Sequence, residues 1–132
     1  MSGNSSVIEF KWSVWDKSPL VSWSCQGVPK SVKFRMPPLA VSHLLSRQVI
    51  AVVGSFDEFG PANLLFFSYD GILEKTFVAP PIGENAQFGA VLEDGSGNVQ
   101  AIIGCKVDGR WKEVAGCLDT DSGAVDNLHR SY

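Results

Sequence analysis

The sequence has few of the residues that carry catalysis or hold metal ions. Its 132 residues include two histidines and three cysteines, Cys25, Cys105 and Cys117, and no two cysteines have Cys-x-x-Cys spacing. An odd number of cysteines without that spacing indicates free thiols rather than a disulfide framework or a zinc ribbon. We therefore expect buried free thiols, no metal ion and no cofactor.

Long apolar runs are also missing. The longest, such as 49–53, are far shorter than the roughly 20 residues that a membrane-spanning helix requires. Residues 1–6 are small and polar and lack the basic stretch and apolar run of a secretory signal. We expect residues 1–6 to form a disordered tail, and the protein to be cytoplasmic and to bind no membrane.

Basic residues are too sparse to predict a nucleic-acid partner. Residues 1–47 hold six basic and two acidic side chains, whereas residues 48–132 hold five basic and twelve acidic ones. Binding of nucleic acid through counterion release requires a concentration of Lys and Arg on one face. The uneven distribution is instead typical of association between complementary charged patches.

Apolar residues are abundant, at 45% of the chain, and much of the sequence alternates apolar with polar residues. Val21, Trp23 and Cys25, for example, alternate with serines, which is the period of a strand with one buried face. Turn sequences such as Asp70-Gly71 separate these segments. The predicted strands are 7–14, 20–26, 31–36, 48–54, 63–69, 72–78, 87–93, 99–107, 111–118 and 124–129.

This pattern predicts one all-β domain over residues 1–132, with about nine or ten antiparallel strands in repeated meanders. At most one short helix is expected, because only residues 39–46 favour a short helix or a loop. Residues 49–53 and 64–67 are apolar at every position, which predicts strands covered on both faces.

The sequence also contains an internal repeat. The segment Val49–Gly54 resembles Val99–Gly104 at an offset of 50 residues. Corners that contain an aspartate, at Asp16, Asp70 and Asp119, recur at about the same interval. Repeats of this length, each a meander of strands, are typical of propeller blades.

The residues of this repeat resemble the blades of WD-repeat and kelch β-propellers. The resemblance is carried by Val14-Trp15-Asp16, by Ser42-His43 with the strand after it, and by Tyr69-Asp70. It implies that His43 and an aspartate form a network that locks the strands, and that the blades present a protein-binding face. A propeller needs about 4–8 blades, and this chain has material for at most three. Either copies associate to complete a ring, or the hairpins pack as a sandwich or a barrel.

Four residues are predicted to bind a partner: Trp15, Asp16, Tyr69 and Asp70. Each aromatic stands directly before a corner aspartate, and aromatics exposed at strand ends are typical anchors for a partner. The alternative is that these aromatics only cover the ends of hairpins.

No catalytic residue is predicted, because no sequence signature joins His43 or His129 to a cysteine. Residues 119–123 begin like a calcium loop, but Ala124 and Arg130 stand where that loop has Gly and Glu, so we predict a hairpin turn. The predicted function is a non-enzymatic protein-interaction domain that associates with itself. The alternatives are a small-molecule-binding β-barrel, similar in size to the intracellular lipid-binding proteins, an inhibitor or immunity-type protein, and a small hydrolase.

Overall fold

The computed structural model describes residues 8–10, 12 and 17–130, without the side chains of residues 8–10 and 130. Within these ranges the chain forms three antiparallel sheets, which confirms the predicted all-β class. The predicted tail 1–6 and the predicted binding residues Trp15 and Asp16 lie outside the described residues.

Each sheet is a meander in which strands consecutive in sequence are hydrogen-bonded neighbours. The first sheet contains β1 (Ile8–Phe10), β2 (Leu20–Cys25) and β3 (Val28–Lys33). The middle sheet contains β4 (Ala40–Leu44), β5 (Val49–Val53), β6 (Leu64–Phe67) and β7 (Leu73–Phe77). The third sheet contains β8 (Glu84–Glu93), β9 (Val99–Val107), β10 (Arg110–Leu118) and β11 (Val125–Arg130).

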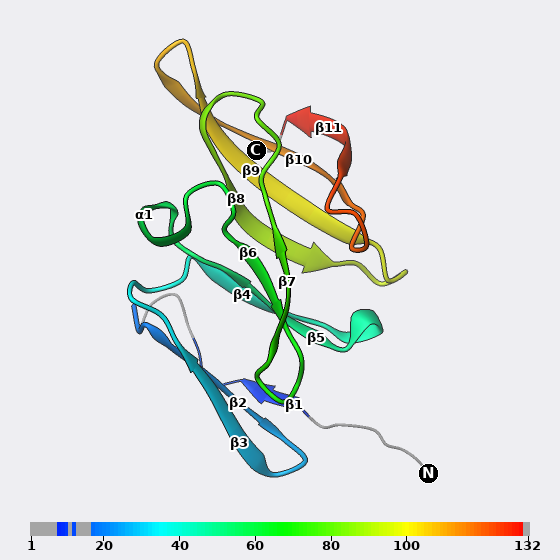
Figure 1. Cartoon of the computed structure of the whole chain (residues 1–132). Coiled ribbons are helices and arrows are strands. Elements are labelled where there is room, and N and C mark those ends of the chain that lie inside the picture. The colour runs from blue at the N-terminus through cyan, green and yellow to red at the C-terminus, as the bar shows by residue number, and fades with distance from the viewer. Residues whose placement is uncertain (1–7, 11, 13–16, 131–132) are drawn as a thin grey trace.

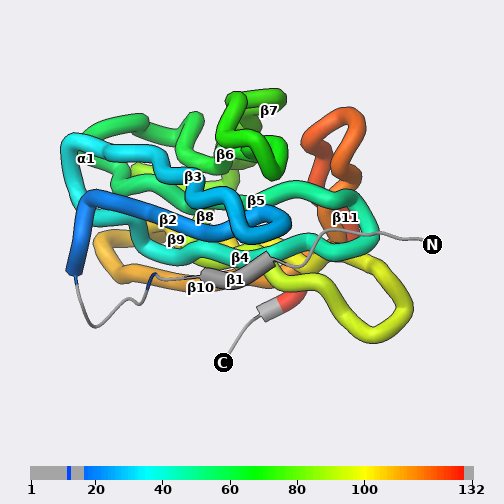
Figure 2. The backbone as a smooth tube through the Cα atoms, turned by 90° about the horizontal axis from the view of Figure 1, so that it is seen from below, coloured from blue at the N-terminus to red at the C-terminus, as the bar shows by residue number. Residues whose placement is uncertain are grey.

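The three sheets are stacked as layers, with the middle sheet between the first and the third (Figure 1). Seen from below, most strands of the three layers run in the same general direction (Figure 2). The described strands pair only within their own sheets, whereas a closed barrel requires one continuous ladder. The architecture is therefore a stack of meanders and not a barrel.

The two central strands of the middle sheet, β5 and β6, are buried on both faces, as their continuous apolar runs predict. Val49, Ala51 and Val53 of β5 belong to the core shared with the third sheet. Ile50 and Val52 belong to the core shared with Val21 and Trp23 of the first sheet. Because successive side chains of a strand point to opposite faces, every position of β5 is apolar.

The helical segments differ from the prediction. Residues 40–44 form β4, paired along its length with β5, and only Leu45–Arg47 form a 3-10 turn. A short helix, α1 (Phe56–Phe59), lies where a loop is predicted. Its Ser55 Oγ accepts a hydrogen bond from the Glu58 amide at 3.2 Å, which is a local signal for a helix start.

The fifty-residue repeat corresponds to one four-stranded meander. The similar segments at 49–54 and 99–104 form β5 and β9, each the second strand of its sheet. Asp70 and Asp119 both lie between the third and fourth strands of their sheets. Asp16, the first of the three corners, lies outside the described residues.

Asn63 ties the middle sheet to the third sheet. Its side chain is fully buried, its Nδ2 donates to the carbonyls of Gly54 and Phe88, and its Oδ1 accepts from the Phe88 amide. The three distances are 2.8–2.9 Å. A buried amide with these partners fixes the position of β8 against the loop before β6.

Candidate functional site

Tyr69 joins two layers at the corner that follows β6. Its hydroxyl is hydrogen-bonded to Nε2 of His43 on β4 at 2.7 Å, and the two rings meet edge to face with centroids 5.4 Å apart. The carbonyl of Tyr69 accepts a hydrogen bond from the indole of Trp23, in the first sheet, at 2.8 Å. This predicted binding residue is thus half-buried and engaged within the molecule.

Burial keeps both rings of this pair neutral. It lowers the pKa of His43 below its usual value, and the Glu93 carboxylate opposes this in part. Burial also raises the pKa of Tyr69, and the electrostatic effects of Cys25 and Glu93 raise it further. The hydrogen bond therefore joins a protonated phenol to a neutral imidazole.

Asp70 has a different environment from Tyr69. Its side chain is exposed, and its carboxylate lies 4.0 Å from Nζ of Lys30 in the first sheet. An exposed ion pair at this distance contributes little to stability. The blade resemblance implies a bond from His43 to an aspartate, whereas the structure joins His43 to the Tyr69 hydroxyl.

Glu93 and Arg47 form a second polar junction, which the sequence does not indicate because the two residues are far apart along the chain. Glu93 accepts hydrogen bonds from the amide and hydroxyl of Ser46, and its carboxylate lies 3.8 Å from the Arg47 guanidinium. Arg47 also donates to the Gly97 carbonyl and to Thr120 Oγ1. Burial favours the protonated form of Glu93, but the hydrogen bonds from Ser46 and from the Leu45 backbone, together with the Arg47 charge, outweigh it and hold its pKa below the usual value.

The remaining candidates for chemistry are separate from these junctions. His129 is exposed, with Nδ1 3.0 Å from the Asn127 carbonyl. Asp119 accepts hydrogen bonds from the amides of Asp121 and Ser122, as expected of a turn aspartate. No group of three His, Cys, Asp or Glu side chains in the described part of the chain is arranged to hold a metal ion.

The three cysteines are free thiols, as predicted, but only one of them is buried. Cys105 lies in the core with 3% of its surface exposed. Cys25 and Cys117 are half-buried. Cys117 alternates along β10 with the core residue Leu118, and it therefore lies on the face of the third sheet that points away from the core.

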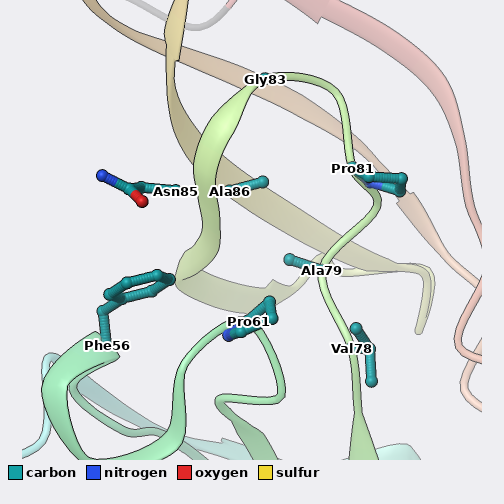
Figure 3. A pocket seen from close by; sticks show the side chains of 8 residues that line it. All are labelled: Phe56, Pro61, Val78, Ala79, Pro81, Gly83, Asn85 and Ala86. Atoms are coloured by element: carbon teal, nitrogen blue, oxygen red, sulfur yellow. The ribbon is translucent and has the colours of Figure 1, made fainter.

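An apolar pocket of about 350 Å³ lies between α1, the loop before β6, the segment that joins β7 to β8 and the start of β8 (Figure 3). Its lining is Phe56, Pro61, Val78, Ala79, Pro81, Gly83, Asn85 and Ala86. None of these side chains is charged, so the pocket accommodates an uncharged apolar group.

The outer face of the third sheet exposes several apolar side chains among the polar Gln100 and Lys106. Trp111, which is 49% exposed, and Leu92, which is 57% exposed, lie on this face with Ile102, Ala115 and Cys117. The Trp111 ring covers Gly104 and leaves no space for a Cβ there. None of the described strands packs on this face. We name these five residues, together with Glu113, the third-sheet outer face.

The opposite end of the stack has a surface of small residues. Ser22 and Ser24 of β2 alternate with the buried Val21 and Trp23, so they point away from the middle sheet. Their strand partners on that side are Ser31 and Pro29, and Leu20 and Lys33 continue the surface. We name these six residues the first-sheet outer face.

No family model, curated protein or solved structure matches this chain in the comparisons. None of the helices in the described ranges has the length and apolar character needed to cross a membrane.

Proposed function

We propose that this chain is a non-enzymatic protein-interaction domain that associates with itself through the outer faces of its stacked sheets. One observation carries the proposal: the third-sheet outer face exposes Trp111 and Leu92 at its two ends, with Ile102 between them along β9. Exposed apolar patches with a large aromatic are typical of interfaces between proteins.

The internal chemistry supports the same class of function. The pair formed by His43 and Tyr69 holds strands and layers together, and Glu93 is occupied by Ser46 and Arg47. Each arrangement links separate strands through its hydrogen bonds, and the His43 and Tyr69 rings also pack edge to face. Both serve to keep the sheets in place.

Light scattering coupled to size exclusion tests the proposal across a series of protein concentrations. We expect a mass that rises above 14.3 kDa towards a multiple of it. Trp111→Ser should return the mass to that of one chain, because it removes the largest apolar side chain of the face. Leu45→Ser is the matched control, since Leu45 is 65% exposed on the 3-10 turn. A single-chain mass at all concentrations would refute self-association.

A second candidate function is the binding of a small uncharged apolar molecule in the pocket of Figure 3. The absence of charged side chains from its lining favours this ligand class. Indole is a suitable probe, titrated while backbone amide resonances are recorded. Saturable shifts confined to residues such as Ala79 and Ala86 are expected, and shifts spread over the whole surface would exclude the pocket as a site.

A further inference from the structure

We infer that the partner is a second copy bound head to tail, with the third-sheet outer face of one protomer on the first-sheet outer face of the next. The inference rests on the proposed self-association and specifies which faces meet. It excludes the symmetric arrangement in which the same face of both copies is buried.

The charges at the two ends of the stack favour unlike ends in contact. Residues 17–36, which include β2 and β3, hold four basic side chains and no acidic one, and β1 adds the acidic Glu9. Residues 84–130, which form the third sheet and its turns, hold eight acidic and four basic side chains. These segments lie at opposite ends of the molecule (Figure 1). Like ends therefore repel each other, and unlike ends attract and steer each other into contact.

The side chains on the two faces are complementary in size. The first-sheet outer face contains three serines, and a hollow of about 420 Å³ lies over it, lined in part by Leu20, Ser22 and Pro29. The third-sheet outer face presents the bulky side chains of Trp111, Leu92 and Ile102. Placing the bulky face on the hollow one fills space, whereas two bulky faces or two hollow faces pack poorly.

Both faces contain a charged residue that the orientation can be tested with. Lys33 lies on the first-sheet outer face, and Glu113 lies opposite Gly104 on the third-sheet outer face, on the same side as Lys106. A face made of strands six residues long and three strands wide measures about 20 by 14 Å. This is small for a specific interface, so we expect association to depend on protein concentration.

The contact also continues the packing within the chain. The middle sheet already carries one sheet on each face, and a head-to-tail contact adds a further layer to the same stack. Such a contact leaves one free face at each end, so it generates rings when the rotation closes and filaments when it does not.

Cysteine cross-linking tests the assignment of the faces. The variant Ser31→Cys with Cys25→Ser places one thiol on the first-sheet outer face, and native Cys117 supplies one on the third-sheet outer face. After mild oxidation, we expect a ladder of dimers, trimers and larger species on a non-reducing gel. The control variant adds Cys117→Ser and should give no species larger than a dimer. Circular dichroism verifies that both variants fold.

Charge reversal provides a second, independent measurement. Lys33→Glu places two acidic groups in apposition and should weaken association roughly tenfold. Adding Glu113→Lys should restore association, because residues 33 and 113 then again carry opposite charges, with the signs exchanged. Asp57→Lys, on α1, is the control for a change of surface charge away from both faces.

These experiments distinguish failure of the head-to-tail arrangement from failure of self-association itself. A single-chain mass by light scattering with no cross-linking refutes the proposed function. A multiple of the chain mass, with cross-links that stop at the dimer through Cys117 pairs, leaves self-association standing and overturns the head-to-tail arrangement. Failure of Glu113→Lys to rescue Lys33→Glu, together with the absence of a ladder, also overturns it.

Discussion

The hydroxyl of Tyr69 and Nε2 of His43 lie 2.7 Å apart on the face of the middle sheet that points towards the first sheet. His43 belongs to β4 and Tyr69 follows β6, so the bond passes over β5, where Ile50 is the strand partner of His43. The same Tyr69 binds Trp23 of the first sheet through its carbonyl. Tyr69 thus links β4 to the corner after β6 within the middle sheet, and it also links the middle sheet to the first sheet.

Tyr69→Phe should destabilise the protein by about 1–2 kcal/mol, because it leaves a half-buried imidazole nitrogen without its hydroxyl partner. Urea unfolding followed by tryptophan fluorescence measures the change. Ser96→Ala, which removes an exposed hydroxyl at the turn between β8 and β9, is the control. An unchanged midpoint for Tyr69→Phe would mean that the bond contributes nothing to stability.

His43 should make stability fall as the pH is lowered. Its pKa in the folded state lies below the ordinary value of 6.5, so below pH 6.5 the unfolded chain binds more protons than the folded one. The free energy of unfolding therefore decreases from pH 6.5 towards the folded pKa. His43→Gln should flatten this slope, as measured by urea unfolding between pH 5.5 and 7.5. Equal slopes for the two proteins would contradict the assignment.

Asn63→Ala should be among the most destabilising single substitutions, by roughly 3 kcal/mol or more, because it orphans the buried amide of Phe88 and two carbonyls. Thermal unfolding measures the loss. Asn98→Ala, at an exposed turn position, is the matched control and should change the midpoint little. A mild effect at Asn63 would mean that water replaces its three hydrogen bonds.

Two glycines that differ in their surroundings should respond oppositely to alanine. A Cβ at Gly116 would lie 2.6 Å from the Asp126 carbonyl oxygen, so Gly116→Ala should cost about 1–3 kcal/mol and loosen β11 from β10. Gly95 has no heavy atom within 4 Å of that position, so Gly95→Ala should be neutral or slightly stabilising. Hydrogen exchange of the β11 amides checks the first effect, and protection equal to wild type would contradict it.

Much of the fold follows from local patterns. The predicted segment 99–107 coincides with β9, and 111–118 differs from β10 by one residue, because alternation and Asp-Gly turns are local signals. The segment 40–44 has no such alternation, and its strand forms because it pairs with the apolar β5. The thiol of Cys105 is buried as predicted, but Cys117 is half-exposed because its side of β10 faces away from the core.

The candidate site was less accessible to prediction. Tyr69 is singled out by its corner, but its bond to His43 depends on a pairing of β4 with β5 that no local signal indicates. The predicted residues Trp15 and Asp16 lie outside the described part of the chain. Trp111 is exposed on the outer face of the third sheet. Alternation along a strand shows which side chains share a face, but it does not show whether another sheet covers that face.

The sequence by itself determined the all-β class, the meander order and the fifty-residue repeat, since strand period and turn chemistry act between neighbouring residues. It also determined that the middle strands lie between two layers, because every position of β5 is apolar. Only the tertiary structure decided which residues meet across the layers, such as Tyr69 with His43 and Asn63 with Phe88. Those contacts depend on stacking between distant segments, and the same stacking leaves the third-sheet outer face exposed.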